Sequence, residues 1–205
     1  MKRKERVIVV DYDDTCVDFI GFLCRLHNKL YKTCITPADF KDYDFDMVEI
    51  KDARNNVVHG EEIRNTFLEY ETEGLYAALP PLPEAKHALK FMKSLGYKII
   101  ILTARKEEYK KQTMMNILHN DMPHDEVIFC PSDLKAKKLR QLSRIYNIQM
   151  FADDKASTIL DVSENTNIKM VVCVNQPHNM GTKLDDEVIR VDSLFEAVRY
   201  LKDIS

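Results

Sequence analysis

The sequence lacks a run of apolar residues long enough to cross a membrane, and its few cysteines do not form a C-x-x-C pair. The five cysteines are an odd, scattered set, which predicts reduced thiols in a cytosolic protein. The apolar run after MKRKER is too short for the core of a signal peptide, and no stretch approaches a membrane span. We therefore expect a cytoplasmic protein, of a cell or of a phage-infected host, with no membrane partner.

An excess of either charge is also missing. Lys and Arg total 30 against 33 Asp and Glu, which gives a formal net charge of −3. Such a balance provides no global attraction to nucleic acid, and the one local cation run, MKRKER, is most simply a solvated tail. We expect no stable nucleic-acid partner. A homodimer is neither required nor excluded.

What the chain does have is a regular alternation of strand and helix patterns. Short, almost continuously apolar runs such as KIIIL predict strands that are buried on both faces of a parallel sheet. The predicted strands are residues 6–10, 97–102, 126–130, 149–152, 169–174 and 188–191. Helical patterns cover residues 84–95, 132–146 and 193–202. This order predicts a three-layer, Rossmann-like α/β fold with a parallel sheet.

Residues 21–79 break the alternation. This stretch has no apolar run like those of the core, but it contains helical patterns at FIGFLCRLHNKLYK and at residues 61–71. The sequence PPLP that follows cannot continue a helix and marks the return to the core. We predict a small helical insertion over the first strand, with residues 1–20 and 80–205 forming the α/β core.

The first apolar run ends in the sequence DYDDT. Asp11 and Asp13 are two residues apart, so an extended chain would direct both side chains to the same side of the sheet end. Crowded carboxylates repel each other unless a proton or cation intervenes, and a divalent metal would relieve that repulsion. A strand followed by an Asx-type turn is the alternative for a lone D-x-D.

The ends of the other predicted strands favour a site over a turn. The sequence ILTAR ends the second strand, FADD ends the fourth, and PSDLKAKKL supplies a lysine between them. Ligands of parallel α/β sheets bind at the carboxyl ends of the strands. One rim of the sheet is therefore expected to gather four carboxylates, a hydroxyl group and two cations.

The order DYDDT, ILTAR, a lysine and FADD resembles the four motifs of the haloacid dehalogenase-like (HAD) phosphohydrolase superfamily, over residues 6–174. The insertion lies where that superfamily carries its first type of cap. Finer details are similar to the 5'(3')-deoxyribonucleotidase family: DF after the first motif, ITPADFKDYD in the insertion, PLPEA before the second motif and QPHN after the last core strand. The resemblance implies a HAD core with a small helical cap.

The resemblance also implies a magnesium-dependent phosphomonoesterase. Asp11 would be the nucleophile that forms an aspartyl-phosphate, and Asp13 would protonate the leaving group and then activate the attacking water. The expected ligands of Mg²⁺ are Asp11, the backbone carbonyl of Asp13, and the acidic pair, with Asp154 bound directly and Asp153 through water.

Three residues after the second strand and one lysine are expected to bind phosphate. These are the hydroxyl of Thr103, the amide of Ala104, Arg105 and Lys135. Thr is also ordinary at a strand end, and Arg105 could simply close the rim. Lys135 could lie on a solvated helix face, which would leave its neighbours at 137 and 138 as rivals.

The remaining candidates surround this set. Phe19 would stack on a nucleobase or would only pack inside the insertion, and Tyr43 and Phe45 are further base-pocket candidates, with Phe40 beside them. Thr15 is expected to brace the loop. Asp14 is interpreted as a spacer where the nucleotidase branch has Gly, and His178 as a loop residue near the site.

The function expected from this resemblance is dephosphorylation of (deoxy)nucleoside monophosphates. A 3'-phosphatase of polynucleotide ends is an alternative, although the chain lacks a basic run to follow a phosphate backbone. A sugar-phosphate phosphatase is another. A different class, a catalytically silent nucleotide-binding protein, would be distinguished by the absence of phosphate release.

Overall fold

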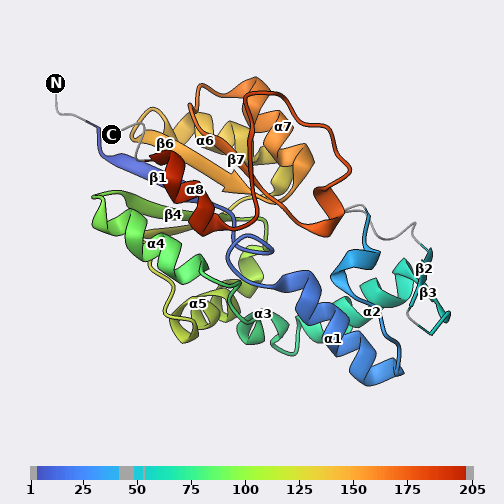
Figure 1. The fold of residues 1–205 in the computed structure, drawn as a ribbon. Coiled ribbons are helices and arrows are strands. Elements are labelled where there is room, and N and C mark those ends of the chain that lie inside the picture. Colours follow the sequence, from blue (N-terminus) through green and yellow to red (C-terminus); the bar gives the residue numbers. More distant parts are fainter. Residues whose placement is uncertain (1–3, 42–48, 53, 202–205) are drawn as a thin grey trace.

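The computed structural model describes residues 4–41, 49–52 and 54–201, and its centre is a parallel six-stranded sheet (Figure 1). The strand order is β5-β4-β1-β6-β7-β8, and every pairing is parallel. The strands are β1 (Arg6–Val10), β4 (Lys98–Thr103), β5 (Glu126–Phe129), β6 (Asn147–Asp153), β7 (Val171–Val174) and β8 (Ile189–Val191). All six predicted strands are confirmed, with end points that shift by one or two residues.

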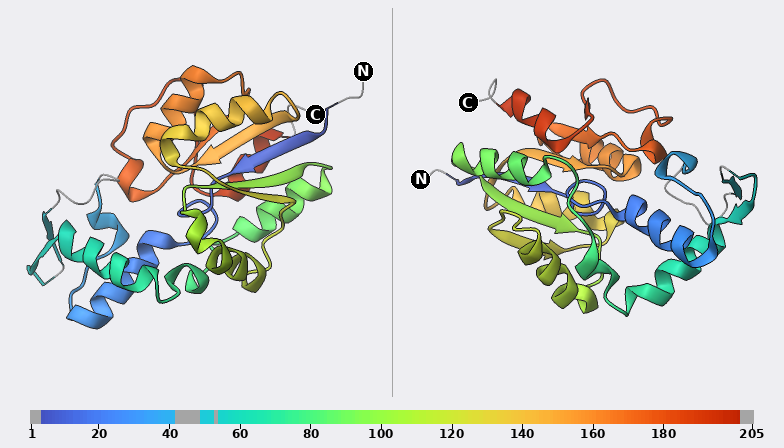
Figure 2. Two further views of the ribbon diagram at one scale, coloured as in Figure 1. Left: turned by 180° about the vertical axis from the view of Figure 1, so that it is seen from behind. Right: turned by 60° about the horizontal axis from the view of Figure 1, so that its bottom comes forward.

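Helices cover both faces of this sheet, as its apolar strands require (Figure 2). Alternate residues of β1 enter two separate clusters: Val7 and Val9 pack with one layer, and Ile8 and Val10 with the other. The first layer contains α6 (Lys135–Leu142) and α7 (Ala156–Asn165). The second contains α4 (Ala85–Ser94), α5 (Lys110–His119) and α8 (Leu194–Leu201). The predicted three-layer α/β fold is therefore observed.

The helix predicted over residues 132–146 is shorter than expected. A 3₁₀ turn, Ser132–Leu134, precedes α6, and the helix ends at Leu142. The amides of Ile145 and Tyr146 both bond to the carbonyl of Leu142, which turns the chain so that β6 can begin at Asn147. The apolar periodicity continues through this turn, and it therefore does not reveal where the helix ends.

The insertion contains helices α1 (Phe19–Tyr31), α2 (Gly60–Glu71) and α3 (Leu75–Ala78). It also contains a two-stranded antiparallel sheet, β2 (Glu49–Lys51) and β3 (Val57–His59), which the expectation of a small helical insertion did not include. Ile50 and Val58 pair across this sheet and enter a small core together with residues of α1 and α2. Strands of three residues are too short to leave a periodic signal.

Backbone contacts join the two ends of the insertion at its base. Val17 forms a bridge with Pro81, the Asp18 amide donates to the carbonyl of Pro80, and the Leu82 amide donates to the carbonyl of Cys16. The insertion leaves and re-enters the core at one point, and it lies beyond the carboxyl ends of the strands (Figure 1). Within the described ranges, no helix is both long and apolar enough to span a bilayer.

Candidate active site

The register of the central strands brings the predicted nucleophile and acidic pair together. Val10 pairs with Ile101 of β4 and with Ala152 of β6, and the amide of Asp11 donates to the carbonyl of Ala152 at 2.8 Å. Asp11 and Asp153 are therefore the next residues on neighbouring strands. Parallel strands place both side chains at one edge of the sheet, as the motif order predicted.

A single buried lysine lies between these two carboxylates. The side chain of Lys135, 1% exposed, places Nζ 2.7 Å from Oδ1 of Asp11 and 2.7 Å from Oδ2 of Asp153. Lys135 is the first residue of α6, so the start of this helix points its side chain into the rim. Lys137 is exposed and Lys138 is half-buried. The structure thus brings Lys135 to the carboxylates.

Burial and mutual repulsion control the protonation of this cluster. Burial raises the pKa of Asp11 to about 7, although Lys135 opposes the shift and Asp153 adds to it. Burial likewise raises the pKa of Asp153 and of Asp154. For Lys135, burial lowers the pKa, but the charges of Asp11 and Asp153 outweigh it and raise the pKa overall. The cluster therefore holds more negative charge than its lysine balances.

These carboxylates fit a divalent cation. Oxygens of Asp11, Asp153 and Asp154 lie within 4.8 Å of one another, and all three residues are buried. Oδ1 of Asp11 makes the ion pair with Lys135 but accepts no well-aligned hydrogen bond from the described residues. A donor set of oxygens only, with excess negative charge, is typical of a magnesium site.

Asp154 has its own set of partners. Its Oδ2 lies 2.8 Å from Nε2 of His178, its Oδ1 accepts from the hydroxyl of Thr15 at 3.3 Å, and its carbonyl accepts from Asn179 at 2.7 Å. Thr15 therefore braces the loop, as expected. The contact of His178 goes further than its interpretation as a loop residue near the site. In the sequence, the one signal of this role is that His178 belongs to the QPHN element, next to Asn179.

Asp13 is not one of the three clustered carboxylates, and its side chain is paired with Arg105. Nε and Nη2 of the guanidinium approach the two oxygens of Asp13 at 2.9 and 2.7 Å. The Arg105 side chain is 1% exposed and that of Asp13 is 20% exposed. Two roles were expected for Arg105, contact with phosphate or closure of the rim. Neither includes this bidentate pair with Asp13. The order of the motifs brings these residues, 92 positions apart, to one rim, but it does not predict that their side chains pair.

Arg105 is held from several sides. Its guanidinium lies over the rings of Tyr12 and Tyr76, 4.8 and 4.4 Å from the two centroids, and its Nη1 donates to the hydroxyl of Thr113 at 3.2 Å. Tyr76 belongs to α3, and its hydroxyl donates to the buried carboxylate of Glu71 at the end of α2. The Arg105–Asp13 pair is thus in direct contact with the insertion.

The two other predicted phosphate-binding residues occupy the end of β4. Thr103 is fully buried, and its hydroxyl oxygen accepts from the amide of Arg105 at 3.2 Å. Ala104, the next residue, is exposed. The hydroxyl proton of Thr103 therefore remains available for another acceptor at the rim. The positions of Thr103 and Ala104 allow contact with a phosphate. The alternative explanation for Thr103, β-strand propensity, gives no reason for a hydroxyl group at this position.

Asp14 is not a simple spacer. Its side chain is buried, and Oδ1 accepts from the amides of Phe19 and Ile20 at 2.9 and 3.0 Å, which adds two hydrogen bonds to the first turn of α1 beside its N-cap residue, Asp18. Its φ of +50° lies in the left-handed region, where Gly costs nothing and Asp is tolerated. This backbone conformation explains why Gly suits the same position in the nucleotidase branch.

Of the aromatic candidates, Phe19 lies at the junction of insertion and core. Its half-buried ring packs against Phe67, with centroids 5.5 Å apart, and Tyr76, at 6.5 Å. Phe40 is fully buried in the core of the insertion, so it does not line a base pocket. Tyr43 and Phe45 lie outside the described residues.

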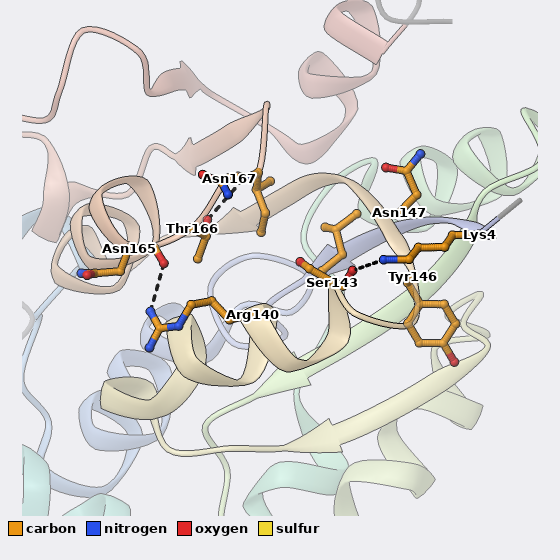
Figure 3. A pocket seen from close by; sticks show the side chains of 10 residues that line it. Lys4, Arg140, Ser143, Tyr146, Asn147, Asn165, Thr166 and Asn167 are labelled. Carbon is orange, nitrogen blue, oxygen red and sulfur yellow. Dashed lines mark hydrogen bonds between the residues drawn. The ribbon is translucent and has the colours of Figure 1, made fainter. Parts of the chain in front are cut away.

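A separate cavity of about 520 Å³ lies at the opposite edge of the sheet, where β6 begins (Figure 3). Its two cations are already engaged, since Lys4 donates to the carbonyl of Ser143 and Arg140 to that of Asn165. None of the described residues that line it belongs to the carboxylate cluster. This cavity is therefore not part of the candidate active site.

Comparisons with known proteins agree with this geometry. Two similar structures are the L-2-haloacid dehalogenase of Xanthobacter autotrophicus (12% identity, TM-score 0.60, 99% of this chain and 100% of that one) and a predicted phosphoglycolate phosphatase from Haemophilus somnus (17%, 0.60, 98% and 100%). At these identities they show the fold. No curated protein matches the sequence. The model of one family, HAD superfamily subfamily IIIB (acid phosphatase), matches residues 1–180, and the chain belongs to this family.

Proposed function

We propose that this acid phosphatase is a magnesium-dependent phosphomonoesterase that forms an aspartyl-phosphate on Asp11 and acts on (deoxy)nucleoside monophosphates. The observation that carries the proposal is the buried cluster of Asp11, Asp153 and Asp154 around the single cation of Lys135. Such a cluster is costly to bury without a function, because each ionised carboxylate loses its hydration. The fit of an oxygen-only donor set to Mg²⁺ supports the metal.

In this proposal Asp11 attacks the phosphorus of the substrate. The attack would join two anions, and Lys135 lowers its cost by holding Oδ1 of Asp11 at 2.7 Å and by offering its ammonium to a phosphate oxygen. Asp11 and Asp154, with the carbonyl of Asp13, would hold Mg²⁺, and Asp153 would contribute through water. When bound, the ion supplies charge neutralisation and a template for the phosphate.

Asp13 would act as the acid and then as the base. To protonate the leaving oxygen, Asp13 must release the guanidinium of Arg105 and take up a proton from solvent before it reaches the substrate. Its side chain is the most exposed of the catalytic set, at 20%, which permits this movement. A phosphate dianion is a good competitor for the guanidinium, so substrate binding itself can free Asp13.

A nucleoside is the proposed leaving group because an aromatic cluster lies beside this rim. The rings of Phe19, Phe67 and Tyr76 pack together next to Arg105. One face of a base stacked on such a ring contributes about 1–3 kcal/mol. The half-buried side chains of Phe19 and Phe67 leave part of their surface open for that contact.

The test is Mg²⁺-dependent phosphate release from p-nitrophenyl phosphate by the wild-type chain and by Asp11→Asn. We expect turnover that EDTA removes and that Asp11→Asn abolishes. Glu187→Gln, a change of an exposed carboxylate, is the matched control and should keep wild-type turnover. Absence of release from any phosphomonoester by the folded wild-type protein would overturn the enzyme proposal.

A substrate panel then tests the leaving group. The 5'- and 3'-monophosphates of deoxyuridine, thymidine and deoxyguanosine should be preferred over sugar phosphates. Phe19→Leu, which keeps apolar volume but removes the ring, should raise KM for nucleotides and leave p-nitrophenyl phosphate unaffected. Preference for 3'-phosphoryl oligonucleotides with steep salt dependence would instead favour a polynucleotide 3'-phosphatase.

A further inference from the structure

The segment after β7 contacts both acidic loops of the candidate active site. Gln176 donates through Nε2 to the carbonyl of Asp14 at 2.7 Å. Asn179 donates through Nδ2 to the carbonyls of Asp154 and Val174 at 2.7 and 2.8 Å. A 3₁₀ turn, Pro177–Asn179, connects these contacts. The segment is therefore fixed to the backbone on either side of the carboxylate cluster.

His178 extends from this fixed turn to one carboxylate of the cluster. Its side chain is 2% exposed, and its Nε2 lies 2.8 Å from Oδ2 of Asp154. An ionised carboxylate only accepts hydrogen bonds, so Nε2 carries the proton in this contact. The hydroxyl of Thr15 donates to the other oxygen at 3.3 Å. With one donor on each oxygen, the plane of the Asp154 carboxylate is determined.

We propose that His178 is a positioning residue that orients Asp154 for the divalent cation, which rests on the metal site of the proposed function. Asp154 provides one of the three buried carboxylates that lie within 4.8 Å of one another. Partners that hold a ligand from behind commonly change metal affinity 10–100-fold when they are removed. The rigid attachment of the turn through Asn179 and Gln176 provides the support that such a role needs.

The experiment measures metal binding directly, without turnover. Mn²⁺, a paramagnetic substitute with the same preference for oxygen ligands, is titrated into the apo protein, and the signal of free Mn²⁺ is followed by electron paramagnetic resonance. His178→Leu replaces the imidazole with an apolar side chain of similar size and removes the hydrogen-bond donor to Asp154. We expect its Kd for Mn²⁺ to rise about 10–100-fold.

Two further variants separate positioning from structure. His178→Gln places an amide donor at a reach similar to that of Nε2, and it should bring the Kd back toward the wild-type value. His27→Leu removes another buried histidine, which contacts Thr66 inside the insertion, and it should leave the Kd unchanged. If His178→Leu does not fold, His178→Asn, whose shorter side chain cannot reach Asp154, takes its place.

The outcomes distinguish this inference from the proposed function. Equal Mn²⁺ affinity in the wild type and His178→Leu would overturn the inference, and so would a His178→Gln variant as weak as His178→Leu. A wild-type protein that binds no Mn²⁺ would overturn it as well. If the wild type binds Mn²⁺ with the expected dependence on His178 but hydrolyses no phosphomonoester, the inference stands and the proposed activity fails.

Discussion

Asp11 and Asp13 lie two residues apart in one loop, but their surroundings are opposite. Asp11 lies among buried carboxylates and shares the single cation of Lys135 with Asp153. Asp13 has a guanidinium to itself and keeps 20% of its side chain exposed. Charge is therefore in excess around the first aspartate and balanced around the second.

This difference suits the two proposed roles. A nucleophile benefits from a fixed position. It also benefits from surroundings with excess negative charge, because such a site attracts a cation that aligns the phosphate with the nucleophile. An acid and base must approach and leave the substrate, which a partly exposed carboxylate can do. The pair with Arg105 gives the Asp13 side chain a counter-charge of its own, although only one residue separates the two aspartates in the sequence.

The largest expected effect comes from removal of the shared cation. Lys135→Met leaves Asp11 and Asp153 buried without a counter-charge, so we expect a loss of about 3–5 kcal/mol in the free energy of unfolding. Urea denaturation in EDTA at neutral pH measures it. Lys137→Met, at an exposed position of the same helix, should change stability by less than about 0.5 kcal/mol. A similar small change in Lys135→Met would contradict the balance of charge described for the cluster.

The second prediction concerns pH. The pKa of Asp11 is raised from 3.8 to about 7 in the fold, so between these values the native state holds a proton that the unfolded chain has released. Stability contributed by this group therefore falls as the pH rises from about 4 to 7 and then stays low. Asp11→Asn should stabilise the metal-free protein by about 1–3 kcal/mol at pH 8.

The same substitution should have a much smaller effect near pH 4, where Asp11 is protonated in the native state and still roughly half protonated in the unfolded chain. Thermal or urea unfolding in EDTA at the two pH values provides the comparison. A stabilisation that is equal at pH 4 and pH 8 would show that the Asp11 carboxylate carries no electrostatic cost in the native state.

The third prediction concerns Asp13, whose charge is balanced by Arg105. Arg105→Lys replaces the bidentate pair with a point charge, and we expect kcat/KM to fall about 10–100-fold. The Mg²⁺ concentration for half-maximal activity should not change, because neither side chain of the pair is among the expected ligands of the ion. A parallel shift in Mg²⁺ dependence would show that the two regions are coupled rather than separate.

The smallest effect is expected at Asp14. Asp14→Ala loses the two hydrogen bonds to the first turn of α1 and keeps a Cβ at φ +50°, whereas Asp14→Gly loses the same hydrogen bonds but suits this backbone. We expect the Gly variant to be more stable than the Ala variant by about 1 kcal/mol. Equal stability, measured by urea denaturation, would mean that the loop relaxes to a negative φ.

The features that the sequence predicted depend on patterns within short, continuous stretches of residues. Runs such as KIIIL identify buried strands, and the parallel order of those strands brings Asp11 and Asp153 to one edge. The pair of Asp13 with Arg105 depends instead on side-chain directions across 92 positions, which no periodicity encodes. The left-handed φ of Asp14 and the three-residue strands of the insertion are similarly invisible to a pattern of apolar residues.

His178 illustrates the same limit. A histidine in a QPHN turn can face solvent, the backbone or a neighbouring loop, and only the packing of the turn against Asp154 decides among them. Lys135 is an intermediate case. The resemblance implies a lysine at this rim, with Lys137 and Lys138 as rivals, and the structure places the Nζ of Lys135 between two carboxylates.

The most direct test of the central claim is chemical trapping of the phosphorylated nucleophile. The wild-type protein and Asp13→Asn, which lacks both the acid for the first step and the base for the second, are mixed with Mg²⁺ and p-nitrophenyl phosphate, whose leaving group departs without a proton. The mixtures are quenched in acid, and the peptide from Val7 to Arg25 is analysed by mass spectrometry after borohydride reduction. The account predicts conversion of Asp11 to homoserine, with more conversion in Asp13→Asn. Release of phosphate with no modification of Asp11, or with modification of another residue, would contradict it.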